Sequence, residues 1–127
     1  MQDKVTYEYA VIRLVPKVER EEFLNIGVIL FSKRKNFLGM KYQLADVRIH
    51  AFSSDIDTNL IRKYLEAWEL ICSGGQEAGP IGALDIALRF RWLSAAKSTI
   101  IQCSKTHPGV CREPSKVLEK LFDFYVL

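Results

Sequence analysis

Apolar and polar side chains alternate in three consecutive segments near the N-terminus, which is the pattern of half-buried strands. The segments are Thr6–Val15, Phe23–Ser32 and Phe37–Leu44. Pro16 ends the first segment because proline has no backbone donor to give to a sheet. The polar stretch 33–36 has the composition of a hairpin turn. We therefore predict an antiparallel β-meander.

The alternation also predicts which meander side chains are buried, because successive strand residues point to opposite faces of a sheet. We expect the core face to carry Ala10, Ile12, Leu14, Leu24, Ile26, Val28 and Leu30. The opposite face then carries Tyr7, Tyr9, Val11, Arg13, Asn25, Gly27, Ile29 and Phe31.

Beyond the meander, the apolar period changes to that of helices. Asp57 is a favourable N-cap for a helix that we predict to run to about Cys72, before the stop at Gly74. Its apolar residues recur at three- and four-residue spacing, which gives one broad stripe. The stripe consists of Leu60, Ile61, Tyr64, Leu65, Trp68 and Ile71.

The C-terminal part is predicted as a helix over Ala83–Leu93, a buried strand over Thr99–Cys103, a loop over Ser104–Glu113 and a closing helix from Pro114. Strands first and helices later are typical of the α+β class. We expect one domain over residues 1–127, in which an antiparallel β-meander sheet is packed by about three helices and joined by one further strand near the C-terminus.

Composition narrows the class of protein further. The net charge of +3 is smaller than is usual for a dedicated nucleic-acid binder. The longest apolar run, Ile26 to Phe31, is too short to span a bilayer. The cysteines are odd in number and lack a Cys-x-x-Cys pair, so we expect free thiols, no disulfide and a cytoplasmic location. No ligand spacing for a metal is present, and no cofactor is expected.

The first candidate site is the strand face that bears Asn25 and Gly27. Asparagine is depleted in strands, and glycine weakens them unless another backbone or a ligand must come close. With Tyr7, Tyr9 and Arg13 on the same face, this is either a flat recognition surface or a β-bulge at which Asn25 caps a neighbouring backbone group.

The second candidate is the polar run from Arg89 to Arg112, which contains Arg91, Lys97, Ser98 and His107. Guanidinium groups, hydroxyls and free backbone amides are the groups that hold a phosphate. Neither standard glycine-rich nucleotide loop is present, and a solvated helix face and loop would show the same composition. We predict that Arg91, Ser98 and His107 line one concave surface, with Asn25 on its floor.

Two further features each have a functional and a structural interpretation. His107 could act as a general base, yet no recognisable nucleophile motif accompanies it, and a loop histidine often makes only a structural hydrogen bond. The basic turn Lys33-Arg34-Lys35 could contact phosphates, or it could serve solubility alone.

Several of these stretches resemble one family. They are Tyr7 to Arg13, Glu22 to Val28, Phe90 to Ala95, Lys97 to Ile101 and His107-Pro108-Gly109. Together they resemble the bacterial domain of unknown function 3037 family over nearly the whole chain. The resemblance implies that the motif residues are Asn25, Gly27, Arg91, Trp92, Lys97, Ser98, His107 and Gly109. Genes of the family often lie beside genes for HipA-like kinases, which implies a physical or regulatory partnership.

The leading hypothesis is a non-enzymatic binding or accessory module that docks on a partner protein, with a HipA-like kinase as the expected partner. The first alternative is an enzyme or sensor that binds a phosphate-bearing ligand through the Arg91 to His107 region. The second alternative, a weak nucleic-acid binder, rests only on the small positive charge and the basic turn.

Overall fold

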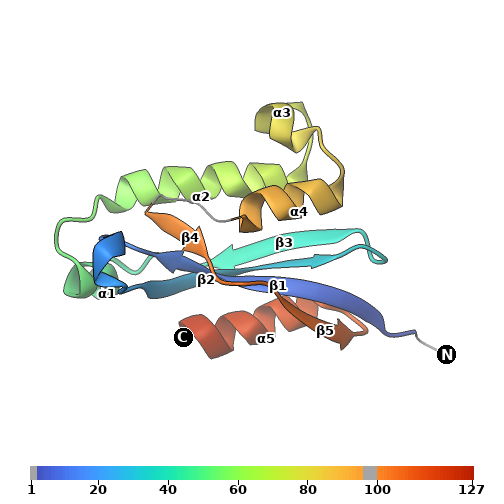
Figure 1. Cartoon of the computed structure of the whole chain (residues 1–127), viewed down its shortest axis with the longest axis horizontal. Helices are drawn as coiled ribbons and strands as arrows, with labels where there is room; N and C mark the ends of the chain where they lie inside the picture. Colours follow the sequence, from blue (N-terminus) through green and yellow to red (C-terminus); the bar gives the residue numbers. More distant parts are fainter. Residues whose placement is uncertain (1–2, 96–99) are drawn as a thin grey trace.

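A single antiparallel sheet forms the centre of the molecule in the computed structural model, which describes residues 3–95 and 100–127. Its strands are β1 (Val5–Leu14), β2 (Leu24–Ser32), β3 (Phe37–Tyr42), β4 (Ile101–Cys103) and β5 (His107–Cys111). The strand order is β3-β2-β1-β4, and β5 pairs with β1 as well (Figure 1). The predicted meander is confirmed as β1, β2 and β3.

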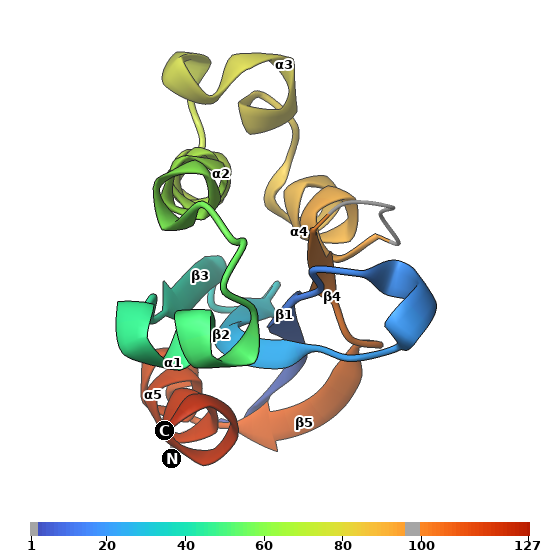
Figure 2. The same cartoon turned by 90° about the vertical axis from the view of Figure 1, so that its left-hand side faces the viewer.

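Helices cover both faces of this sheet. The predicted helices are α2 (Thr58–Ser73), α4 (Ile86–Ser94) and α5 (Pro114–Val126). Figures 1 and 2 show α2 and α4 on one face and α5 on the other. The α+β class is therefore confirmed. Shorter elements that were not predicted are η1 (Val18–Arg20), α1 (Asp46–Phe52), η2 (Gln76–Ala78) and α3 (Gly79–Gly82).

The two faces enclose separate apolar cores. The larger core lies under α2 and α4 and includes Ile12, Phe31, Leu65, Trp68 and Phe90. The smaller core lies under α5, where Val28 and Leu30 contact Leu118. The burial of Trp68 confirms that α2 packs its predicted stripe on the sheet. Leu60 and Tyr64, at the edge of that stripe, are exposed instead.

A β-bulge in β2 determines which of its side chains face each core. Ile12 pairs with Gly27 and Arg13 with Asn25, so Ile26 is an extra residue without a partner on β1. One extra residue reverses the direction of every later side chain on its strand. The prediction that Val28 and Leu30 share the face of Ile26 is therefore wrong. Ile29 and Phe31 join Ile26 in the larger core, and Val28 and Leu30 face α5.

The segment predicted as a loop over Ser104–Glu113 contains β5, so that prediction is wrong. Val5 to Tyr9 of β1 pair with residues 107–111, and Ile12 to Leu14 pair with β4. Buried Ser104 separates the two short strands: its Oγ accepts a hydrogen bond from Val11 N at 2.8 Å. Of the predicted strand Thr99–Cys103, Thr99 lies outside the described residues.

Side chains satisfy backbone groups at both ends of α2. Asp57 is the N-cap of α2, as predicted, and accepts hydrogen bonds from Asn59 N and Leu60 N. Arg89 donates hydrogen bonds to the carbonyl groups of Ile71 and Cys72 at 2.9 and 2.8 Å. These carbonyl groups lie in the C-terminal turn of α2, where no donor within the helix is available. None of the helices in the described part of the chain has the length and apolar character needed to cross a membrane.

Candidate functional site

Asn25 lies against the C-terminus of α5. Its Nδ2 donates to the Tyr125 carbonyl oxygen at 3.3 Å. Arg48 of α1 donates in the same way to the Val126 carbonyl oxygen. Both carbonyl groups belong to the last turn of a helix, where no intrahelical donor is available. The structure thus places Asn25 at the bulge and makes it a cap of a neighbouring helix.

Gly27 is required by close contact between strands. A Cβ atom at this position would lie 2.7 Å from the Lys41 carbonyl oxygen and 2.9 Å from Tyr42 Cβ on β3. Atoms do not approach so closely, and the nearest of these belongs to backbone that the sheet holds in place. The glycine therefore allows β3 to pair beside the bulge, which is a structural role.

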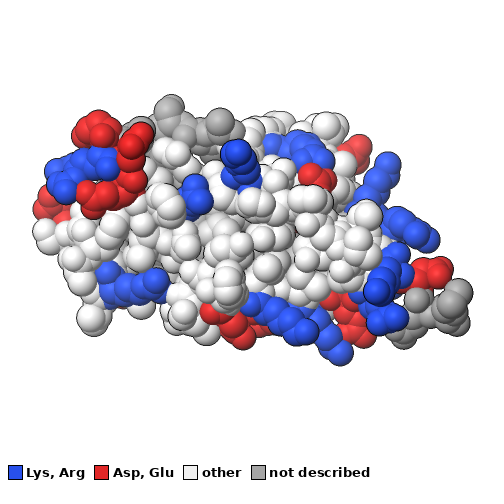
Figure 3. Space-filling view, turned by 60° about the horizontal axis from the view of Figure 1, so that its bottom comes forward, with Lys and Arg blue, Asp and Glu red and all other residues white. Residues whose placement is uncertain are grey.

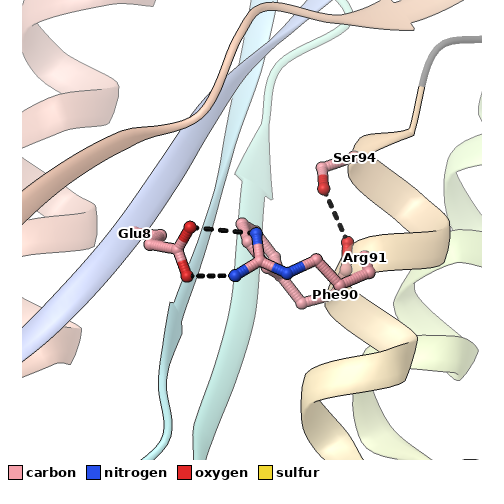
Figure 4. A network of polar contacts seen from close by, with 4 residues as sticks. All are labelled: Glu8, Phe90, Arg91 and Ser94. Carbon is pink, nitrogen blue, oxygen red and sulfur yellow. Dashed lines mark hydrogen bonds and ion pairs between the residues drawn. The ribbon is translucent and has the colours of Figure 1, made fainter.

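Arg91 of α4 forms an ion pair with Glu8 of β1. Its Nη1 and Nη2 donate to the two carboxylate oxygens at 2.9 and 2.6 Å (Figure 4). The guanidinium group also lies near the ring of Phe90, with its carbon 5.4 Å from the ring centre. The hydrogen bond to Glu8 raises the pKa of Arg91. The fork of donors that was predicted to hold a phosphate is therefore occupied by a carboxylate from the same chain.

His107 packs on Tyr9, with ring centres 5.2 Å apart. The hydroxyl groups of Tyr9 and Tyr125 are hydrogen-bonded at 2.9 Å, which places this pair of rings on the α5 face. Burial, together with that hydrogen bond, raises the pKa of Tyr9 to about 12, so its hydroxyl stays protonated at neutral pH. His107 thus contributes to an aromatic cluster with Tyr9 and Tyr125.

Arg91 and His107 consequently lie on opposite faces of the sheet. Their partners Glu8 and Tyr9 are adjacent in β1, and adjacent strand residues point in opposite directions. The prediction that Arg91 and His107 line one concave surface is wrong, because their spacing along the sequence does not report on which face each residue lies. Lys97 and Ser98, the other members of that predicted site, lie outside the described residues.

The motif glycine Gly109 has a local structural explanation. It pairs with Tyr7 across β1 and β5. A Cβ atom at Gly109 would lie 2.2 Å from the Tyr7 ring. The tyrosine therefore packs directly over the glycine, in a pairing of glycine with an aromatic residue that stabilises sheets.

Trp92 leads to a different feature, a hollow of about 360 Å³ between α2, the C-terminal turn of α4 and the start of β4. We call it the apolar groove; it is lined by Tyr64, Ala67, Trp68, Ile71, Trp92, Ile100 and Ile101. Tyr64 and Trp92 are 44% and 41% exposed. The volume is at the lower end of the roughly 300–1,000 Å³ typical of ligand sites. Of the residues in this lining, the sequence had singled out Trp92 alone as a site residue.

The signal that could have revealed the groove is the width of the apolar stripe on α2. The stripe includes Tyr64, which was assigned to the core together with Trp68 and Ile71. When the apolar stripe of a helix is wider than the part that contacts the core, the side chains at the edge of the stripe stay on the surface. Such side chains form the wall of a surface hollow.

The titratable side chains of the described residues do not gather into a metal site. No group of three or more His, Cys, Asp or Glu residues within 3–95 and 100–127 is arranged to hold an ion. Cys72, Cys103 and Cys111 form no disulfide. Burial raises the pKa of the Cys72 thiol to about 12, so it is a poor nucleophile near neutral pH.

The ion pair between Arg91 and Glu8 allows a direct test of the role of Arg91. Both side chains are partly exposed, so we expect Arg91→Ala to lower the free energy of unfolding by less than about 1 kcal/mol. The measurement is urea denaturation of the Arg91→Ala and Glu8→Gln variants and the double variant. A coupling energy of about 0.2–1 kcal/mol between the two positions is expected. Full loss of folding on Arg91→Ala would contradict this result.

Comparison with known proteins bears on the whole domain. No curated protein and no solved structure matches the chain. Residues 9–126 match a family whose description is "Protein of unknown function (DUF3037)". The match covers most of β1, all the other strands and α5, and it confirms the resemblance seen in the sequence. The chain belongs to this family of domains of unknown function.

Proposed function

We propose that this domain is a non-enzymatic binding module that docks on a partner protein through the apolar groove. The observation that carries the proposal is the composition of the groove, in which every lining side chain from the described part of the chain is apolar or aromatic. Tyrosine and tryptophan contribute most strongly to binding energy at protein interfaces. Exposed Tyr64 and Trp92 form two walls over a floor that includes Ile101.

The chemistry of the groove defines the occupant that it fits. Among residues 3–95 and 100–127, its lining contains no charged side chain, so these residues would not offset the cost of removing a charged ligand from water. It suits instead one or two large apolar side chains, such as those on one face of an amphipathic helix. We therefore propose an apolar anchor segment of a partner protein, and a HipA-like kinase is the first partner to test.

The alternative of a phosphate-bearing ligand bound through the Arg91 to His107 region receives less support. The Arg91 guanidinium is paired with Glu8, and the His107 ring packs with Tyr9 on the other face of the sheet. We also propose that the protein works in the cytoplasm, where free thiols such as Cys72 persist.

Isothermal titration calorimetry of the domain with a purified HipA-like kinase from the same genome tests this proposal. Trp92→Ala is expected to weaken binding about tenfold or more, because the variant removes a large aromatic wall of the groove. Phe124→Ala is the matched control, since Phe124 is 78% exposed and lies on α5, across the sheet. The control should change the affinity less than about twofold.

Each result has a defined meaning. If the kinase does not bind the unaltered domain, it is not the partner. If it binds and Trp92→Ala has no effect while circular dichroism shows both proteins folded, the groove is not the interface. Equal losses for Trp92→Ala and Phe124→Ala would also contradict docking through the groove.

A further inference from the structure

Basic side chains converge on two adjoining hollows at one end of the molecule. The hollows have volumes of about 320 and 420 Å³ and share Arg112 and Glu113 in their linings. We call them together the cationic basin. Its basic residues are Lys4, Arg34, Lys35, Arg112, Lys116 and Lys120, and its acidic residues are Asp3 and Glu113.

The fold brings these side chains together from distant parts of the chain. Val5 pairs with Cys111, so Lys4 lies near Arg112. Figure 1 shows the N-terminus, the β2–β3 turn and the end of β5 at the same end of the domain. Lys116 and Lys120 are one turn apart on α5 and therefore on the same side of the helix. Figure 3 shows Lys and Arg side chains gathering at that end.

The β2–β3 turn lies close enough to the start of α5 for its positive charge to affect pKa values there. Burial raises the pKa of the Cys111 thiol, and the Lys35 ammonium acts in the opposite direction. The hydrogen bond from Lys116 lowers the pKa of Glu113, and Lys35 contributes in the same sense. The basic turn predicted from the sequence is thus one side of a larger surface.

Most of the basic side chains in this basin form no ion pair with another described residue. Glu113 and Lys116 form an ion pair at 2.9 Å. Within residues 3–95 and 100–127, Lys4, Arg34, Lys35, Arg112 and Lys120 form no ion pair. Gathering like charges costs free energy, and this cost is recovered when an anion binds. Solubility alone requires only that charges be spread over the surface.

We propose that the cationic basin binds an acidic peptide segment of a partner protein. The hollows are open and adjoin one another, so an extended chain can follow them and place successive carboxylates near Arg34, Arg112 and Lys120. Guanidinium groups bind carboxylates through paired hydrogen bonds. This inference goes beyond the apolar groove, because no described residue lines both the groove and the basin.

The composition of the basin favours a peptide over a nucleic acid. A nucleic-acid backbone presents closely spaced phosphates, and these would meet the carboxylates of Asp3 and Glu113. A peptide also presents N–H groups between its acidic side chains, and those carboxylates can accept them. The described residues that line the two hollows include no aromatic side chain on which a base could stack.

The test uses the full chain and a fluorescein-labelled peptide of glutamate residues, with binding followed by fluorescence anisotropy at low ionic strength. Arg34→Glu combined with Arg112→Glu is expected to weaken binding at least about tenfold, because two attractive charges become repulsive. The control is Lys63→Glu combined with Lys105→Glu, which changes the net charge equally at exposed positions outside the basin. The control should weaken binding less than about threefold, since those charges act only over a distance.

Further measurements make the outcome decisive. Lys35→Glu alone, a single change at an exposed turn residue, replaces the double variant if that variant does not fold. No binding of the peptide by the unaltered chain overturns the proposal. Equal losses in the basin and control variants overturn it as well, because they indicate unspecific charge attraction. Tighter binding of a duplex DNA of matched charge, lost in the basin variant, would assign the surface to nucleic acid instead. If the basin variant loses peptide binding but still binds the partner of the groove, the two surfaces act independently. That result separates this proposal from the proposed function.

Discussion

Replacement of Phe90 by alanine is expected to lower the free energy of unfolding by about 3–5 kcal/mol. The Phe90 side chain has no exposed surface, and its ring stacks on Phe31 with ring centres 5.2 Å apart. This contact joins α4 to β2 across the larger core. Alanine would leave a cavity that the neighbouring strand and helix cannot fill without breaking their own contacts.

Equilibrium denaturation in urea measures this effect. Leu88→Ala is the matched control, because Leu88 lies on the same helix and is 51% exposed. Both leucine and alanine are good helix formers, so the control should change the free energy of unfolding by less than about 1 kcal/mol. Similar losses at positions 88 and 90 would mean that α4 does not pack in the orientation described here.

Replacement of Gly27 by alanine is the second large effect, with an expected loss of about 1–3 kcal/mol. The added Cβ would lie 2.7 Å from the Lys41 carbonyl oxygen. This oxygen belongs to the backbone of β3, which pairs with β2 on that side. Relief of the contact therefore requires the two strands to move apart beside the bulge.

Gly39→Ala is the appropriate comparison, because Gly39 lies on β3 within the same pair of strands. The atom nearest to a Cβ there is the end of the Phe37 ring at 2.9 Å, and a side chain can rotate away. Gly39→Ala should thus cost less than Gly27→Ala in the same denaturation measurement. A larger loss at position 39, or no loss at position 27, would contradict the role given to the close strand approach.

These expectations change the interpretation of the family motif. Gly27 and Gly109 accommodate neighbouring atoms, Asn25 satisfies a helix carbonyl, and Arg91 pairs with Glu8. Each role is explained by contacts inside the domain. The surfaces to which we assign binding are instead formed mainly by other residues, such as Tyr64 and Ile71 in the apolar groove and Arg34 and Arg112 in the cationic basin.

The sequence by itself determined the elements that rest on local physics. Alternation of side chains predicted the strands that became β1, β2 and β3. Apolar spacing and the Asp57 cap predicted α2, and Pro114 marked the first turn of α5. In each case, the signal lies within one segment, where neighbouring residues share a period or a capping hydrogen bond.

Only the tertiary structure decided which segments meet. The extra residue at Ile26 reverses the later part of β2, so Val28 and Leu30 face the second core under α5. The short strand β5 contains Pro108 and Gly109, which by composition indicate a loop, yet pairing with β1 makes it part of the sheet. Register and face depend on contacts between residues far apart in sequence. The separation of Arg91 from His107, and the meeting of Arg34 with Arg112, are both consequences of those contacts.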